Sequence, residues 1–115
     1  MSAGLVMTVD VGHPPRSAAR VEEDLQQAWD TARNSPAVRL LKIVHGYGSR
    51  GSGGSTRDVA RNWLFRNRAR FRGVIEGERY TLFAEETRAM RAVVGSYADP
   101  DLAAGNPGMT VVWVR

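Results

Sequence analysis

The chain begins with two apolar runs that flank an amphipathic segment. Residues 5–11 (LVMTVDV) are rich in β-branched side chains and precede a Gly-His-Pro-Pro stretch, so they predict a strand that ends in a loop. After Ser17, a suitable N-cap, apolar residues over 18–32 recur every three or four positions and predict a helix that Asn34-Ser35-Pro36 ends. Residues 38–44 (VRLLKIV) are typical of a parallel strand covered on both faces. The pattern therefore predicts a βαβ unit.

The remaining pattern predicts a second helix, a weaker third helix and two further strands. The second helix begins near Ser55 or Thr56 and places Val59, Ala60, Trp63 and Leu64 on one face. A third strand is expected at 73–76 with a short continuation at 79–83, a third helix at 85–94, a polar loop at 97–105, and a last strand at 109–114 (MTVVWV). We therefore predict an α/β fold, a two-layer sandwich of a mixed four-stranded sheet and two to three helices in the order βαβαβ(α)β, forming a single domain over residues 1–115.

The absence of cysteine narrows the chemistry of the chain. With no cysteine among 115 residues, disulfide scaffolding, thiolate zinc sites and cysteine nucleophiles are excluded together. No apolar run approaches the ~18 residues that a membrane span needs. Residues 1–4 carry no basic side chain, and Asp10 interrupts the first apolar run, so a secretory signal is not expected. We expect a cytoplasmic protein without a membrane partner.

Basic charge is concentrated in the middle of the chain. Between Ser49 and Ile75 there are seven arginines against one acid, Asp58, which gives this stretch +6, while the whole chain is +4 and the remainder therefore −2. Arg57, Arg61, Phe65 and Arg68 recur every three or four residues on one face of the second predicted helix. Clustered guanidinium groups around an exposed aromatic favour a polyanionic partner. A solvated basic helix face is the alternative.

The two histidines of the chain both follow predicted strands. Asp10, Gly12 and His13 come at the end of the first strand, and His45 and Gly46 come at the end of the second. Loops that leave the carboxyl ends of parallel strands meet at one edge of the sheet, where ligands of α/β proteins bind. The alternative is that His45 forms a backbone hydrogen bond at a strand end and that His13 lies in solvent. We expect the two loops to converge.

A glycine-rich loop follows the second strand. Gly46, Gly48 and Gly51 spell G-x-G-x-x-G between a strand and a helix, which has the form of a dinucleotide fingerprint. The motif follows the second strand and not the first, and 115 residues cannot hold both halves of a dinucleotide fold. No Gly-Lys-Ser/Thr is present, so a Walker loop is excluded. A flexible connector is the alternative.

Three motifs occur in an order and spacing that match a known family. An apolar strand ends in Val9-Asp10-Val11-Gly12, the run 38–44 leads into His45-Gly46-Tyr47-Gly48, and the turn Gly105-Asn106-Pro107-Gly108 precedes the last strand. Over nearly the whole chain this resembles the Smr (small MutS-related) domain, whose motifs are an L-D-x-H strand end, an H-G-x-G loop and a late glycine-rich turn. Asn106-Pro107 departs from the glycine and variable residue that the family usually has there.

The resemblance implies both a fold and a function. It implies a two-layer α/β sandwich that binds branched or structured DNA, or RNA. Some members of the family nick nucleic acid, with the strand-end acid, its histidine and the H-G-x-G histidine implicated. Asp10 and His45 occupy two of these positions, whereas Gly12 stands in place of the first histidine and His13 comes one residue later. An offset of one residue beyond a strand can reverse the direction of a side chain, so the role of His13 is open.

Three functions follow as hypotheses. The first is a nucleic-acid-binding module whose contacts come from His45, Gly46, Tyr47, Gly48, Arg50, Arg57, Arg61, Gly105, Asn106 and Gly108. The second is an endonuclease in which Asp10 holds a divalent ion, Mg²⁺ or Mn²⁺, or orients water, while His45 or His13 donates a proton to the leaving oxygen. The third is a nucleotide-binding module with Glu76 or Glu78 on the ribose. For the first, Arg57 and Arg61 are expected to be exposed.

Overall fold

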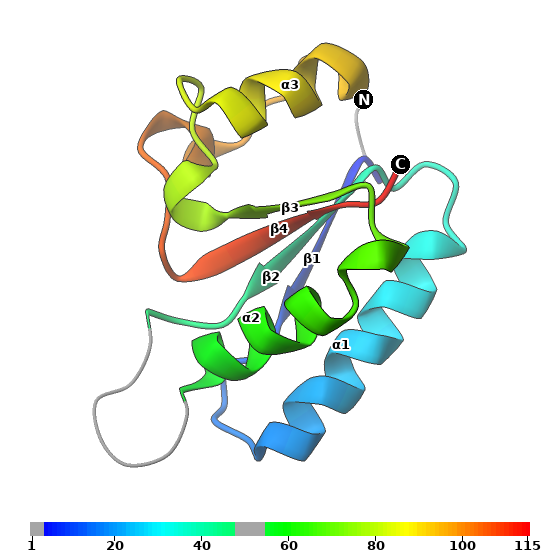
Figure 1. Ribbon diagram of the computed structural model, residues 1–115, viewed down its shortest axis with the longest axis vertical. Coiled ribbons are helices and arrows are strands. Elements are labelled where there is room, and N and C mark those ends of the chain that lie inside the picture. Colours follow the sequence, from blue (N-terminus) through cyan, green and yellow to red (C-terminus); the bar gives the residue numbers. More distant parts are fainter. Residues whose placement is uncertain (1–3, 48–54) are drawn as a thin grey trace.

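The structure, a computed structural model, describes residues 4–47 and 55–115 (Figure 1). Its helices and strands are β1 (Val6–Asp10), α1 (Ala18–Arg33), β2 (Leu40–Val44), α2 (Thr56–Arg66), β3 (Gly73–Glu76), α3 (Glu85–Val94) and β4 (Met109–Trp113). Three short 3₁₀ turns are interspersed, η1 (Arg68–Arg70), η2 (Gly77–Arg79) and η3 (Pro100–Ala103).

The four strands form one mixed sheet in the order β1-β2-β4-β3. β1 and β2 pair in parallel, and β4 runs antiparallel to both β2 and β3. The predicted α/β fold with a mixed four-stranded sheet is confirmed. The last strand lies inside the sheet, and β1 and β3 are its two edges.

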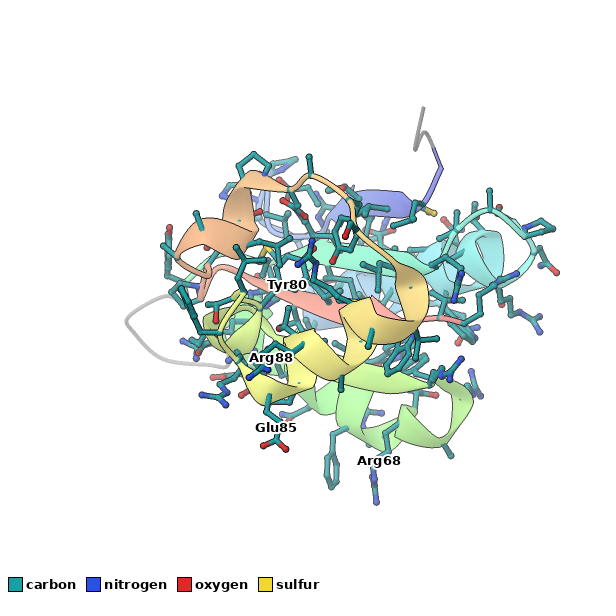
Figure 2. The ribbon with its side chains drawn as sticks, turned by 90° about the horizontal axis from the view of Figure 1, so that it is seen from above. Arg68, Tyr80, Glu85 and Arg88 are labelled. Carbon is teal, nitrogen blue, oxygen red and sulfur yellow. The ribbon has the colours of Figure 1, made fainter. Side chains whose placement is uncertain are left out.

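Each face of the sheet carries its own core. α1 and α2 cover one face and form the two-layer sandwich with it, around a cluster centred on Leu25, Trp29, Ile43, Trp63 and Val112. α3 and η3 lie on the opposite face, where Leu40, Tyr80, Met90, Met109 and Val111 are buried. Figure 2, seen from above, shows α3 crossing that face. Leu40 and Leu41 serve different cores because successive strand residues point to opposite faces.

Two serines fix the helix starts at the predicted positions. The Ser17 hydroxyl accepts a hydrogen bond from the amide of Arg20 at 3.2 Å, and the Ser55 hydroxyl accepts one from the amide of Asp58 at 3.1 Å. These contacts satisfy backbone donors that an isolated helix leaves without partners. The start of α2, which sets the phase of its arginines, is therefore determined by Ser55.

The predicted continuation of the third strand at 79–83 is wrong. After β3 the chain turns through η2, and the Tyr80 amide bonds back to the carbonyl of Gly77 at 3.2 Å. A side chain on Gly77 would place its Cβ only 1.7 Å from the Asn106 carbonyl oxygen, so the backbones of η2 and the late turn touch directly. This close contact ends the strand. The predicted loop at 97–105 likewise contains the unpredicted turn η3.

Across residues 4–47 and 55–115, no helix is both long enough and apolar enough to cross a membrane.

Candidate nucleic-acid interface

Four strand ends and one helix start meet at a single edge of the sheet. The register pairs Asp10 with Val44, Val44 with Met109, and Glu76 with Thr110, so the loops after β1, β2 and β3 and the turn before β4 lie together. The loops after β1 and β2 border an open cleft of about 390 Å³ beside the start of α2. The cleft is lined by Gly12, His13, Pro15, His45, Gly46, Tyr47 and Thr56. The predicted convergence of the two histidine loops is found, while the predicted contacts Gly48 and Arg50 lie outside the described residues.

Asp10 folds the first loop back on itself. Its carboxylate accepts hydrogen bonds from the amides of Gly12 and His13, each at 2.9 Å, and lies 3.1 Å from Nδ1 of His13. Burial raises the pKa of the Asp10 carboxyl, but the bonds from Gly12 and His13 outweigh it and lower the pKa below its usual value. The turn therefore brings the exposed His13 ring to the cleft in spite of its displacement by one residue.

Position 12 has no room for a side chain because the loop after β1 contacts the loop after β2 there. A Cβ at this position would lie 2.8 Å from the carbonyl oxygen of His45, closer than a side chain tolerates. The residue that departs from the Smr pattern is thus required by the contact between the loop after β1 and the loop after β2. Histidine cannot occupy position 12 with the backbone arranged this way.

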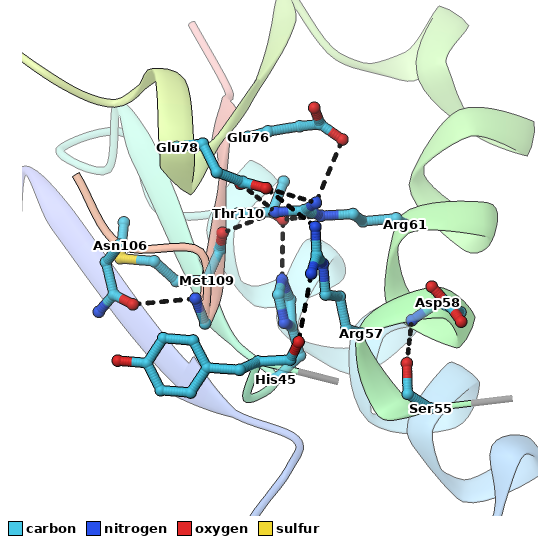
Figure 3. A network of polar contacts seen from close by, with 12 residues as sticks. His45, Ser55, Arg57, Asp58, Arg61, Glu76, Glu78, Asn106, Met109 and Thr110 are labelled. Atoms are coloured by element: carbon cyan, nitrogen blue, oxygen red, sulfur yellow. Dashed lines mark hydrogen bonds and ion pairs between the residues drawn. The ribbon is translucent and has the colours of Figure 1, made fainter. Parts of the chain in front are cut away.

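His45 is buried beneath the cleft and has both ring nitrogens in hydrogen bonds, of which Figure 3 shows the one to Thr110. Nδ1 lies 2.7 Å from the carbonyl oxygen of Gly46, which can only accept, so Nδ1 carries the proton. Nε2 then accepts from the Thr110 hydroxyl at 2.9 Å, and the Thr110 oxygen accepts from Nε of Arg61 at 3.1 Å. His45 is 3% exposed, and both of its ring nitrogens are engaged in hydrogen bonds within the protein.

The surroundings of His45 keep it neutral. Burial is the main cause that lowers the pKa of its imidazole; the carbonyl of Gly46 opposes this, and the positive charges of Arg61 and Arg57 lower the pKa further. A neutral imidazole is the form that can donate through one nitrogen and accept through the other. His45 therefore links β2 to β4 as a neutral hydrogen-bonding group.

The expectation that Arg57 and Arg61 are exposed is wrong. The side chains are 30% and 16% exposed, and both pair with Glu78, at 2.9 and 2.7 Å. Arg61 also lies 3.4 Å from the Glu76 carboxylate (Figure 3). The acids come from the end of β3 and from η2, which face α2. These arginines therefore lower the pKa of Glu78, mainly through the hydrogen bond from Arg61.

The late turn joins the cleft through its backbone. The amides of His45 and Gly46 both donate to the Gly108 carbonyl, at 2.9 and 3.0 Å. The Asn106 side chain accepts from the Gly108 amide at 2.9 Å, and Gly105 has a φ of 76°, a left-handed conformation that favours glycine. Gly105, Asn106 and Gly108 therefore shape the entry to β4, and these polar groups are already engaged in hydrogen bonds within the turn and with the loop after β2.

Two residues of this network were not anticipated from the sequence. Thr110 stands in an apolar strand, and the signal that could have found it is a lone hydroxyl on the α2 side of a buried strand. Glu78 is considered from the sequence only as an alternative to Glu76 for a ribose contact under the nucleotide-binding hypothesis, whereas its carboxylate is held by Arg57 and Arg61. The signal for this ion pair is an acid two residues after a strand, where that strand lies opposite a helix that carries arginines.

The donor set does not fit a bound divalent ion. Within the described part of the chain, no three His, Asp or Glu side chains come close enough to hold a metal. Asp10 is the carboxylate of the cleft, and its oxygens already accept from Gly12 and His13. Mg²⁺ and Mn²⁺ prefer several oxygen ligands, which this cleft does not offer.

No family model matches the chain, and searches of curated proteins and of solved structures gave no match either.

Proposed function

We propose that the protein is a nucleic-acid-binding module of the Smr type that recognises structured DNA or RNA. The observation that carries the proposal is the meeting of two glycine-containing loops at the cleft, at one end of an arginine-bearing helix, with the late turn hydrogen-bonded to the second of these loops. Tyr47 is 69% exposed there and offers an aromatic surface with a hydroxyl. His13 and Thr56 add polar groups on the same cleft. Such groups are the usual contacts to phosphate and sugar.

The cations suited to phosphate lie at the far end of α2. Arg68, Arg70 and Arg72 are exposed, and none has a carboxylate partner among the residues described. Arg68 bonds to the Phe65 carbonyl, Arg70 to the Gln26 side chain, and Arg72 lies over the ring of Trp113. A cation that no acid neutralises gains most from a phosphate. The proposed surface therefore includes the cleft and these three exposed arginines beyond the end of α2.

The experiment is a salt titration of binding to single-stranded, duplex and branched DNA and to RNA, followed by fluorescence anisotropy. Three arginine-phosphate contacts should give a log-log slope of about −2 to −3. Arg70→Gln should reduce that slope by nearly one unit. Arg88→Gln, on α3 at the other face of the sheet (Figure 2), is the matched control and should leave it unchanged. A flat salt response for the wild type, or equal effects of the two variants, would sink the proposal.

A second candidate, phosphodiester cleavage, is favoured by the contact between Asp10 and His13. The carboxylate holds Nδ1 of His13 and so leaves Nε2 available at the cleft for proton transfer. His45 cannot assist in this arrangement, because both its nitrogens are bonded. One free imidazole supplies half of an acid–base pair, so we rank cleavage below binding. Nicking by the wild type that is absent from Asp10→Asn and from His13→Ala would reverse this order.

The described residues give no observation that favours the nucleotide-binding alternative. Glu78 is held by two arginines, and Glu76 lies 3.4 Å from one of them, so both carboxylates already have a cationic partner on α2. Most of the glycine loop, residues 48–54, lies outside the described residues.

A further inference from the structure

α2 and the edge strand β3 hold a small groove between them. It is separate from the cleft, encloses about 180 Å³, and is lined mainly by Arg61, Leu64, Phe65, Arg68, Val74 and Glu76. Leu64 is buried and forms the floor, whereas Phe65 is 64% exposed and Val74 is 37% exposed. Two apolar side chains thus meet solvent beside each other, where neither contributes fully to a core.

The groove presents flat surfaces and positive charge. The Arg68 guanidinium lies 3.9 Å from the centroid of the Phe65 ring, which places a planar cation on a planar aromatic group. Figure 2 shows Arg68 reaching away from the body of the molecule. Glu76 is the acid of this lining and lies 3.4 Å from Arg61, which leaves Arg68 as the lining cation without a carboxylate partner among the described residues. An aromatic ligand that is attached to a negative charge complements such a groove.

We infer that this groove receives an unpaired base of a single-stranded nucleic acid, stacked on Phe65, with the adjoining phosphate held by Arg68. The inference rests on the proposed nucleic-acid binding and specifies that the groove between α2 and β3 prefers single-stranded nucleic acid. Volume supports it, since about 180 Å³ is below the ~300 Å³ at which pockets for drug-sized ligands begin and suits one flat ring system. In a duplex both faces of each base are stacked on neighbours, so only an unpaired base can offer a face to Phe65.

The test compares two exposed phenylalanines. Phe65→Ala removes the stacking surface, and Phe83→Ala removes a ring that is 85% exposed and outside the groove. Affinity for a single-stranded DNA and a single-stranded RNA oligonucleotide should fall about ten-fold in Phe65→Ala, because the variant loses the aromatic face on which the base stacks. Affinity for a blunt duplex should stay within about two-fold in the same variant. Phe83→Ala should resemble the wild type with every ligand.

A second pair of variants separates stacking from simple apolar contact. Phe65→Trp should keep or raise single-strand affinity, and Phe65→Leu should lose nearly as much as Phe65→Ala, because leucine has no flat face. Thermal unfolding of each variant should match the wild type within a few degrees, since the ring is largely exposed.

The outcomes distinguish this inference from the function on which it rests. If the wild type binds no nucleic acid at any salt concentration, the proposed function fails. If the wild type binds but Phe65→Ala weakens duplex and single strand equally, or weakens neither, the groove takes no base and this inference alone is overturned. Retention of full single-strand affinity by Phe65→Leu would overturn stacking in the same way.

Discussion

The arginines of α2 and η1 form a series from Arg57 to Arg70, and the two ends of this series have different side-chain partners. Near the cleft, Arg57 and Arg61 lie opposite Glu78 and are paired with it at 2.9 and 2.7 Å. At the other end, Arg68 and Arg70 contact a carbonyl oxygen and an amide side chain and meet no acid among the described residues. Residues of one type, in one periodic series, thus serve the fold at one end and remain available to a ligand at the other.

The difference shows that neutralisation, and not position on a helix face, decides which arginine can bind phosphate. Arg61 is 16% exposed and supports Thr110, and through it His45. Removing the Arg61 guanidinium takes a hydrogen bond away from a buried partner. This lowers the free energy of unfolding more than the loss of an exposed charge does. Four predictions test this contrast.

The largest effect is expected for Arg61→Ala. The change removes the Nε donor to Thr110 and one of the two guanidinium partners of Glu78, and it should lower the free energy of unfolding by about 2 kcal/mol. Arg68→Ala is the matched control, and its cost should stay within about 0.5 kcal/mol. Denaturation by urea measures both. Equal losses in the two variants would remove the contrast between the ends of the series.

The next effect concerns the hydroxyl at the centre of the network. Thr110→Val keeps the shape of the side chain but leaves Nε2 of His45 and Nε of Arg61 without an oxygen, so it should cost about 1–2 kcal/mol. Thr110→Ser retains the hydroxyl and should cost less. A Thr110→Val variant as stable as the wild type would show that the hydrogen bonds of Thr110 do not stabilise the fold.

A smaller effect should appear as a pH dependence. Because the folded pKa of His45 lies below its unfolded value, the unfolded chain binds more protons as pH falls through about 6.5, and stability should decrease there. Above that pH the contribution of neutral His45 to the free energy of unfolding is fully present. Below the pKa of His45 in the folded protein this contribution is lost completely. His45→Gln should abolish this decrease, whereas His13→Gln, which removes the exposed imidazole, should retain it. Unfolding free energies measured across this range decide the matter.

The smallest effect is a gain of affinity. Glu78→Gln should release Arg57 and Arg61 from their shared acid and strengthen nucleic-acid binding a few-fold, with a steeper salt dependence. Glu86→Gln is the control, because it changes the net charge equally but disturbs only Arg79 on the other face. If both variants bind equally well, general charge explains the gain and the specific pairing does not.

Much of the fold was predictable because it rests on local signals. The serine caps at Ser17 and Ser55 and the apolar periodicity placed α1 and α2, and the run ending at Val44 marked a strand covered on both faces. The segment 79–83 was not predictable in this way. Its turn depends on contact between Gly77 and Asn106, which are distant in the sequence.

The candidate site was predictable in its location but not in the state of its side chains. Topology brings the loops of His13 and His45 together, since parallel strands end at one edge. The burial of His45 and the pairing of Arg61 depend on side chains from β4 and η2, which no local pattern connects to them. Periodicity identifies the face of a helix, whereas the residues opposite that face come from the tertiary fold.

The position of β4 has a consequence for synthesis on the ribosome. Residues 109–113 form a central strand, and among residues 4–47 and 55–115 β3 has no strand neighbour other than β4. A nascent chain that has reached only α3 can form the β1-α1-β2 unit, but β3 and α3 have no completed sheet on which to pack. The domain therefore closes after translation has passed Trp113, and until then the emerging polypeptide exposes apolar segments that chaperones recognise.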